Sequence, residues 1–288
     1  MKLRVFASGW ALGSLGAALD ELESGLYDGL EAAVPIERRA AREVRQKLDD
    51  GGSTWIADLA TGSDYAPHSS VALDEHLDDL KRGLERAAEA RVELVTCSAG
   101  SDSWPIERAI EFFGAALELA DQFLVPVAFE TRRGRPTFTP WATLAILRAL
   151  PKLRLTCDFS QWCVVCERLP DDSSPLAHAM SHASHLRARV GYAQGPQVPD
   201  PRAPEFRTEL ARHESWWWAI WKIQRDQRCP IVTATPSFGL DGYTHELPFT
   251  RSPVTNPIEV NRWMVQRLRN AFTEIEATTP ERTSNVAR

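Results

Sequence analysis

Short runs rich in apolar residues alternate along the chain with longer runs in which apolar residues recur every three or four positions. The first pair illustrates the pattern: residues 3–9 (LRVFASG) are mostly apolar, and helical spacing follows at Leu15, Ala18, Leu22 and Leu26. Short apolar runs bounded by turn residues are typical of strands buried on both faces of a parallel sheet. The sequence therefore predicts strand-then-helix units.

The pattern occurs eight times without a long linker or a break in composition. The predicted strands are residues 3–9, 27–34, 54–60, 92–100, 124–130, 153–159, 186–192 and 231–238. The predicted helices are at about 15–26, 36–48, 73–87, 103–117, 139–147, 175–185, 210–224 and 258–275. Eight such units favour a single (β/α)8 TIM barrel over residues 1–275, with a flexible C-terminal tail at 276–288. An open doubly wound sheet is the alternative, but the turn after the first strand, SGWALGSLG, lacks a clean G-x-G-x-x-G pattern.

Composition narrows the classes of function. The chain of 288 residues is 43% hydrophobic and 25% charged, with a formal net charge of −6, values typical of globular proteins. This mild acidity argues against a general nucleic-acid binder. No apolar run approaches the ~20 residues of a membrane span, and the start, MKLRVFASGW, does not resemble a secretory signal. Five cysteines, an odd number, favour reduced thiols and a cytoplasmic protein.

Polar residues stand at the ends of the predicted strands, where barrels of this kind place their active sites. The residues selected by this rule are Trp10, Glu31, Asp58, Thr61, Ser98, Glu130, Asp158, Arg187, Arg189 and Ser237. Glu130 and Asp158 directly follow apolar strands, in which a carboxylate does not stay charged without a partner. Both are therefore expected to be metal ligands, catalytic acids or bases, or members of ion pairs with nearby arginines.

Four segments carry a resemblance to a known family: FETRRGRPTFTPW (129–141), CDFSQWCVVCERL (157–169), RARVGYAQGPQVPDPR (187–202) and TPSFGLDGYTHELPFT (235–250). They resemble the xylose-isomerase-like TIM-barrel superfamily of sugar isomerases and epimerases. Within it they look most like the bacterial proteins labelled sugar phosphate isomerase/epimerase. The resemblance runs from the first strand to the last helix.

The resemblance implies a divalent metal site, but this chain departs from it. Members of the superfamily hold one metal with a Glu, an Asp, a His and a second Glu, and the two glutamates move protons between neighbouring carbons of a sugar. The first Glu matches Glu130 and the Asp matches Asp158. The His, in a motif that normally reads H-x-H-A-R-x-G-Y, is Arg187 here, and the last Glu, in T-P-E-F-G, is Ser237.

Other positions depart in the same way: Gln161, Arg132 and Ser98 stand where the family has His. A guanidinium can form two parallel hydrogen bonds to a carboxylate. We therefore expect Arg187 to lie at the place of the metal and to neutralise Glu130 and Asp158. A cation beside two remaining carboxylates opposes a divalent ion. The sequence predicts no bound metal or other cofactor, with Mn²⁺ or Mg²⁺ as the alternative.

The resulting hypothesis is a divergent, metal-independent, sugar isomerase/epimerase-like protein that binds or acts on a small sugar-like or anionic metabolite. Glu130 or Asp158 would be the acid/base, and Arg187 the electrophile that stabilises a developing enolate-like oxygen. The candidate substrate-binding residues are Arg133, Arg189, Gln161, Ser237, His185 and Trp10. Two alternatives stay open: a non-catalytic binding or scaffold protein, and a metal-dependent isomerase whose ligands include His185 or His245.

Two further features have ordinary structural explanations. Cys163 and Cys166 have no second pair at zinc-like spacing, which favours burial on a short helix. Trp216, Trp217, Trp218 and Trp221 point in different directions on a helix. We expect most of these indoles to be buried and an exposed one to support a homodimer.

Overall fold

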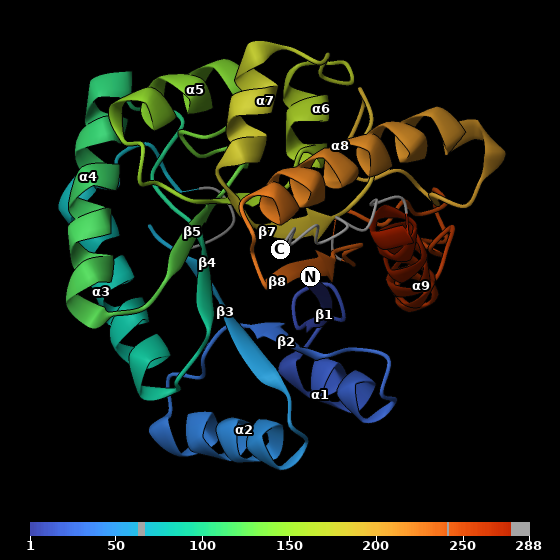
Figure 1. Ribbon diagram of the computed structural model, residues 1–288, viewed down its shortest axis with the longest axis horizontal. Coiled ribbons are helices and arrows are strands. Elements are labelled where there is room, and N and C mark those ends of the chain that lie inside the picture. The colour runs from blue at the N-terminus through green and yellow to red at the C-terminus, as the bar shows by residue number, and fades with distance from the viewer. Residues whose placement is uncertain (63–66, 241, 278–288) are drawn as a thin grey trace, which may run out of the picture.

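The chain folds into a closed barrel of parallel strands surrounded by helices (Figure 1). The computed structural model describes residues 1–62, 67–240 and 242–277. Its strands are β1 (Lys2–Ser8), β2 (Gly29–Ala32), β3 (Thr54–Ala60), β4 (Leu94–Ser98), β5 (Val127–Glu130), β6 (Leu155–Cys157), β7 (Ala183–Ala188) and β8 (Ile231–Pro236). Successive strands pair in parallel, and β8 pairs with β1 to close the barrel. The predicted (β/α)8 barrel is confirmed.

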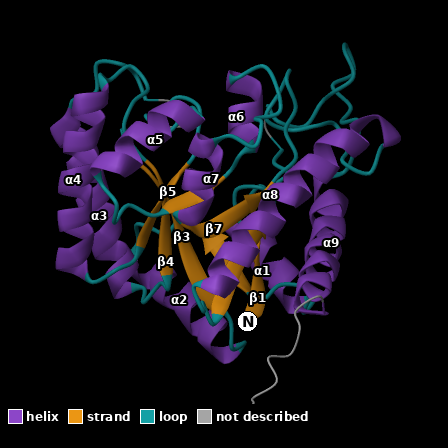
Figure 2. Cartoon of the chain, turned by 45° about the horizontal axis from the view of Figure 1, so that its top comes forward, coloured by secondary structure: helices purple, strands orange, loops and turns teal. Residues whose placement is uncertain are grey.

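Helices cover the outside of the strands (Figure 2). Within the described residues they are α1 (Leu15–Glu23), α2 (Arg38–Asp50), α3 (Leu73–Glu89), α4 (Ile106–Phe123), α5 (Pro140–Ala149), α6 (Ser160–Val165), α7 (Ser174–Ser181), α8 (Arg207–Asp226) and α9 (Pro257–Ala277). Each helix that the spacing predicts is present. The short α6 carries Cys163, as expected for the CVVC segment.

Local sequence signals explain where helices begin and which face they bury. Helix α5 begins at Pro140, and the Thr139 hydroxyl accepts a hydrogen bond from the Ala142 N–H at 3.2 Å. Proline suits this first turn because its missing N–H would have no helical partner there. Helix α3 buries Leu80 and Leu84 against the barrel, and burial of such a side chain contributes roughly 1.5–3 kcal/mol.

The prediction for the seventh strand was wrong in its boundaries. The sequence predicts a strand at 186–192, whereas β7 runs from Ala183 to Ala188 and α7 ends at Ser181. His185, predicted to lie in the helix, is an inward-facing strand residue. Arg189 follows the end of β7 and lies in the loop above it. Since side chains alternate along a strand, Leu186 and Ala188 face the helices while His185 and Arg187 face the barrel interior.

Burial agrees with most of the expectations for cysteine and tryptophan. Cys97, Cys157 and Cys163 are buried free thiols, whereas Cys166 and Cys229 are half-buried and free. On α8, Trp216, Trp217 and Trp221 are buried, and Trp218 is partly exposed. The homodimer stays a prediction.

The end of the barrel lies slightly beyond the predicted boundary, because α9 continues to Ala277. The remainder of the predicted tail, 278–288, lies outside the described residues. Within the described parts of the chain, none of the helices combines the length and the apolar character needed to cross a membrane.

Candidate functional site

A cavity opens at the carboxyl ends of the strands. Its volume is about 260 Å³, and its walls are Trp10, Asp58, Ala60, Ser98, Arg132, Arg135 and Arg187. These residues come from the ends of β3, β4 and β7 and from the loops after β1 and β5. Larger hollows lie along α8 and between α2 and α3, away from the strand ends at which barrels of this fold place their chemistry.

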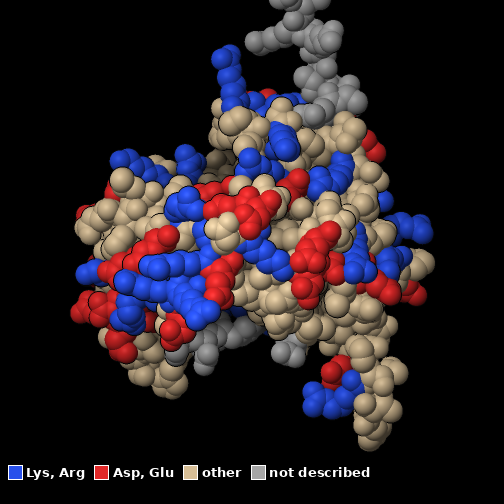
Figure 3. Space-filling view, turned by 90° about the horizontal axis from the view of Figure 1, so that it is seen from below, with Lys and Arg blue, Asp and Glu red and all other residues tan. Residues whose placement is uncertain are grey.

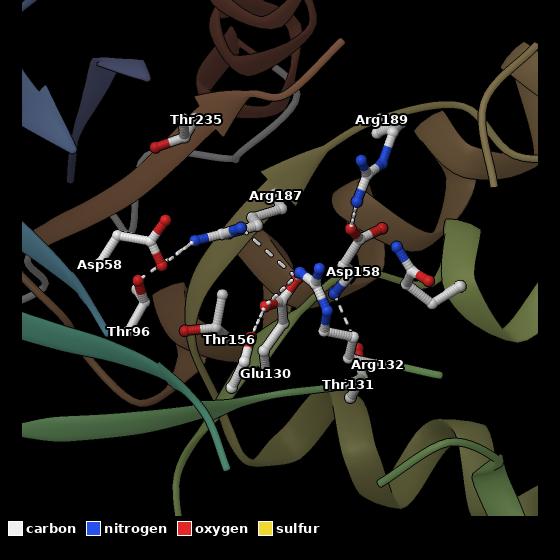
Figure 4. A network of polar contacts seen from close by, with 12 residues as sticks. Asp58, Thr96, Glu130, Thr131, Arg132, Thr156, Asp158, Arg187, Arg189 and Thr235 are labelled. Carbon is white, nitrogen blue, oxygen red and sulfur yellow. Dashed lines mark hydrogen bonds and ion pairs between the residues drawn. The ribbon is translucent and has the colours of Figure 1, made fainter. Parts of the chain in front are cut away.

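Arg187 lies at the centre of the polar cluster beneath this cavity (Figure 4). Its Nη2 donates to Glu31 Oε1 at 2.7 Å and to Asp58 Oδ1 at 2.9 Å, and its Nη1 lies 3.5 Å from Glu130 Oε1. The guanidinium therefore joins carboxylates from β2, β3 and β5. The Arg187 side chain is 5% exposed, and those of Glu31 and Glu130 are 1% exposed.

Hydroxyl groups and a second arginine complete the shell around these carboxylates. The Ser98 hydroxyl donates to Glu130, and Arg132 Nη1 lies 3.2 Å from Glu130 Oε2. The Thr96 hydroxyl donates to Glu31 Oε1 at 2.9 Å. Both oxygens of Glu130 therefore have donors, whereas both hydrogen bonds to Glu31 go to Oε1, and its Oε2 lies 3.4 Å from His185 Nε2.

Asp158 belongs to a separate ion pair, so the expected contact of Arg187 with Asp158 was wrong. Arg189 Nη2 and the Ser160 hydroxyl both donate to the Asp158 carboxylate. Arg189 lies two residues after Arg187, a separation of about 6.6 Å along extended backbone. This places its guanidinium one layer above that of Arg187, level with Asp158. Asp158 and Arg189 are both buried.

Aromatic rings cover the Arg189 guanidinium. Its Cζ lies 4.6 Å from the ring centre of Tyr243 and 5.4 Å from that of Trp10. The two rings meet edge to face at 5.0 Å, an arrangement that stabilises both the aromatic pair and the cation. Trp10, a predicted substrate-binding residue, therefore lines the cavity and also packs over Arg189.

The carboxylates around Arg187 differ in their proton affinity. Burial opposes ionisation of Glu31 and Glu130, but Arg187 together with the other cations and hydrogen-bond donors around them outweighs it and lowers both pKa values, that of Glu130 to about 2. Burial raises the pKa of Asp58, and the negative charges of Glu31 and Glu130 oppose the effect of Arg187 there. Asp58 therefore holds a proton more readily than its two neighbours.

Asp58 is also the accessible member of the cluster. Its side chain is 27% exposed, and it is the one carboxylate lining the cavity among the described residues. An accessible acid with a raised pKa, beside a fixed guanidinium, is an arrangement suited to proton transfer.

The other predicted binding residues lie at different depths. His185 does not face the cavity: it is buried beneath Arg187, with its ring nitrogens 2.8 Å from the Thr233 hydroxyl and 3.1 Å from the Thr235 hydroxyl. Arg133 lies outside the cavity wall, with its Cζ 5.7 Å from the Tyr243 ring centre. The roles of His185 and Arg133 in substrate binding stay predictions.

Gln161 and Ser237 are buried next to the Arg189 layer. The Gln161 amide donates weakly to the Tyr243 hydroxyl at 3.4 Å. Gln161 Oε1, Ser237 Oγ and Arg189 Nη1 are buried without a hydrogen-bond partner among the residues described. Buried polar atoms normally have a partner, so this group can accept a ligand hydroxyl or water.

The residues at these strand ends do not fit a divalent metal. In the described ranges, no group of three or more His, Cys, Asp or Glu residues is placed to hold a metal ion. The carboxylates of Glu31, Asp58 and Glu130 surround a guanidinium, and its positive charge repels a dication. The alternative ligands do not supply the missing set, because His185 lies below the site and His245 contacts the Tyr192 hydroxyl at 3.1 Å.

Sequence reasoning missed part of this site. Glu31, Asp58 and Ser98 were selected as strand-end residues but assigned no role, and Arg132 was noted only as a departure from a motif. A stronger signal was available: LEA and ADLA place a carboxylate within or at the end of an apolar strand, as VAFE does at Glu130. The argument that a buried carboxylate needs a partner therefore applies to Glu31 and Asp58 as it does to Glu130.

The comparisons with known proteins agree with this architecture. Residues 20–209 match the model of the xylose isomerase-like TIM barrel family. A search of curated protein sequences finds no significant match. The fold, the parallel closed barrel and this match define the class: the chain belongs to the xylose isomerase-like TIM barrel family.

Solved structures show the same fold at low sequence identity. A D-tagatose 3-epimerase-like protein is 10% identical, with a TM-score of 0.65 over 95% of this chain and 98% of that one. An L-ribulose 3-epimerase is 12% identical, with a TM-score of 0.63 over 98% and 99%. Endonuclease IV from Thermus thermophilus is 13% identical, with a TM-score of 0.58 over 95% and 100%. Such different activities on one fold mean that the function follows from the site.

Proposed function

We propose that the barrel mouth binds a small sugar-like or carboxylated metabolite and moves a proton on it without a metal ion. The observation that carries this proposal is the contrast around Arg187: Glu31 and Glu130 are locked and ionised, while Asp58 reaches the cavity with a raised pKa. The cavity of about 260 Å³ lies just below the ~300–1,000 Å³ of most ligand pockets. It therefore suits a molecule no larger than a monosaccharide.

The proposed step is abstraction of a proton from a carbon next to a carbonyl group. The Asp58 carboxylate takes the proton, and the electron pair moves to the carbonyl oxygen. The guanidinium groups of Arg187 and Arg132, both on the cavity wall, stabilise that developing negative charge. The neighbouring carbon carries a hydroxyl group, and its proton then passes to the enolate oxygen, which becomes the new hydroxyl. Asp58 returns its proton to the former carbonyl carbon, and the oxygen that gave up its proton becomes the new carbonyl.

The presence of one accessible base favours isomerisation over epimerisation. Inversion at one carbon requires proton removal on one face and delivery on the other, and therefore two groups. The position at which the resemblance places the second glutamate is Ser237, which is buried. A single base can move a proton between adjacent carbons on one face, as an aldose–ketose exchange requires.

Glu130 and Asp158, the carboxylates favoured by the sequence, are less suited to be the base. A pKa of about 2 makes Glu130 a weak base at neutral pH, and its contacts instead hold Arg132 and Arg187 in place. Asp158 is buried under its pair with Arg189. Their proposed role is to position the arginines.

A non-catalytic binding protein is the second candidate, and a specific observation favours it. Glu31, Glu130 and Asp158 are all held in buried ion pairs with arginines, as in a site built to keep its shape. A protein that only binds its ligand has no need of the Asp58 proton.

Proton exchange in D₂O separates the two candidates. Purified protein is incubated with a panel of aldoses, ketoses and sugar acids, and loss of carbon-bound hydrogen is followed by NMR. We expect exchange with at least one compound, and a loss of at least about 100-fold in Asp58→Asn. The matched control, Asp121→Asn on the exposed face of α4, should keep full exchange.

Each outcome decides between the candidates. Exchange that persists in Asp58→Asn excludes Asp58 as the base. Saturable binding without exchange across the panel supports the binding protein. Exchange accompanied by inversion at the same carbon contradicts the one-base scheme.

A further inference from the structure

A groove separates α2 from α3 on the outer face of the barrel. Helix α3 packs directly against α4, whereas α2 and α3 make little direct contact. The space between them has a volume of about 740 Å³, which is typical of small-molecule sites. Neighbouring helices of a barrel normally fill such a space with apolar side chains, so an open groove here requires an explanation.

Arginines line this α2–α3 groove. They are Arg38, Arg42, Arg45, Arg82, Arg86 and Arg91, against the three carboxylates of Asp49, Glu85 and Glu89. This excess of positive charge lies in a molecule whose formal net charge is −6. Figure 3 views the molecule from the side on which α2 lies in Figure 1, and shows basic side chains gathered in a band with acidic ones along it.

Ion pairs hold four of these six arginines, among them Arg45 with Asp49 at 2.9 Å and Arg82 with Asp79 at 2.5 Å. Arg38 pairs with Glu89 at 2.9 Å and Arg91 pairs with Asp49 at 2.6 Å, so both pairs bridge the two sides. Arg42 on α2 and Arg86 on α3 have neither an ion pair nor a hydrogen bond among the residues described.

Arg45 adds a directed donor to the same groove. One of its nitrogens, Nη2, contacts Asp49 Oδ1 at 2.9 Å and the Ser53 carbonyl at 3.0 Å. Its Nε is buried and has no partner among the described residues. A buried guanidinium N–H without an acceptor is costly. The side chains of Arg42 and Arg86 and the Nε of Arg45 therefore present donors without a partner among the described residues in one groove.

The two ends of the groove differ in character. Val34, Pro35 and Ile36 form an apolar wall before α2 begins, and Ile36 is 81% exposed. Guanidinium groups match the geometry of phosphate oxygens, and an apolar wall suits a flat ring.

We propose that the α2–α3 groove binds a small molecule that carries phosphate groups and a planar ring, with the phosphates between Arg42, Arg45 and Arg86 and the ring against Ile36. The site is distinct from the barrel mouth, because none of these residues lines the cavity at the strand ends.

Isothermal titration with three probes tests this assignment: ATP, inorganic tripolyphosphate and adenosine. We expect saturable binding of ATP, weaker binding of tripolyphosphate and none of adenosine. The double variant Arg42→Ala/Arg86→Ala should weaken ATP binding at least about tenfold. These side chains make no contact that the fold uses, so the variant should unfold at the wild-type temperature.

Arg39→Ala is the matched control. Arg39 lies on α2, is 92% exposed, pairs with Glu43 and does not line the groove. Its removal changes the same kind of charge on the same helix and should leave ATP binding unchanged. No binding at millimolar ATP, or equal weakening by Arg39→Ala, would overturn the proposal. Ile36→Ser should weaken ATP binding but not tripolyphosphate binding, and an equal effect on both would refute the placement of the ring.

Discussion

Replacing Arg187 by methionine should destabilise the protein and invert the dependence of its stability on pH. Arg187 lies 2.7 Å from Glu31, 2.9 Å from Asp58 and 3.5 Å from Glu130. Methionine keeps much of the volume but removes the cation. Removal of one partner from a buried ion pair costs about 3–5 kcal/mol, so we expect a loss of about 4 kcal/mol at pH 7. This is a large part of the ~5–15 kcal/mol of a typical protein.

The sign of the pH dependence follows from the pKa shifts. In the wild type, the pKa values of Glu31 and Glu130 lie below their unfolded values, because Arg187 and the other cations and donors around them together outweigh burial. Their stabilisation is therefore present above about pH 4.5 and is lost as the pH falls towards the folded pKa. Without Arg187, burial dominates and raises both pKa values above the unfolded ones. The carboxyls then stabilise the fold at low pH and lose that effect as the pH rises.

Urea unfolding, followed by tryptophan fluorescence at pH 7 and pH 5, measures this difference. In the wild type, Glu31 and Glu130 should contribute equally to the unfolding free energy at pH 7 and at pH 5. The Arg187→Met protein should regain about 2 kcal/mol of unfolding free energy at pH 5. Arg267→Met, which removes a half-exposed surface pair with Glu214, should cost at most about 1 kcal/mol at either pH. A loss below about 1 kcal/mol for Arg187→Met, or a variant less stable at pH 5 than at pH 7, would refute the reasoning.

Further outcomes follow from packing and thiol burial. A Cβ at Gly239 would overlap the Trp10 ring, so Gly239→Ala should lower the melting temperature and loosen the covering of the site. Gly114→Ala on α4, where nothing lies within 4 Å, should instead raise stability by roughly 0.5–1 kcal/mol in urea unfolding. Cys97, Cys157 and Cys163 are buried, whereas Cys166 and Cys229 are half-buried, so a thiol reagent should label only Cys166 and Cys229 rapidly in the native protein.

The sequence predicts the barrel because its periodicity is strong at every unit. The apolar runs of β3 and β5 and the stripe of α3 each specify their element through spacing alone. The seventh strand was predicted to start three residues too late. Apolar and polar residues alternate equally well in SHLRA and in LRARV, and alternation does not say where strand pairing begins or stops. The barrel decides this: β7 pairs with β8 from Leu186 to Ala188.

The sequence predicts that Arg187 pairs with Glu130 and Asp158, and the structure has the contact with Glu130 but pairs Asp158 with Arg189. The replacement at Arg187 pointed to an ion pair with strand-end carboxylates. Which carboxylates it meets depends on the stagger of the strands around the barrel, and that stagger places Arg187 with Glu31, Asp58 and Glu130, and Arg189 with Asp158. The distinct role of Asp58 depends on its exposure, which no motif contains.

The central claim is that Arg187 has taken the place of a divalent metal, and metal content tests it most directly. Purified protein is incubated with Mn²⁺, Mg²⁺, Co²⁺ and Zn²⁺, desalted, and measured by elemental analysis alongside Glu130→Ala and Arg187→His. We predict well under about 0.1 metal per chain for the wild type under every condition, since the guanidinium opposes a dication among its carboxylates. About one metal per wild-type chain, lost in Glu130→Ala, would contradict the account.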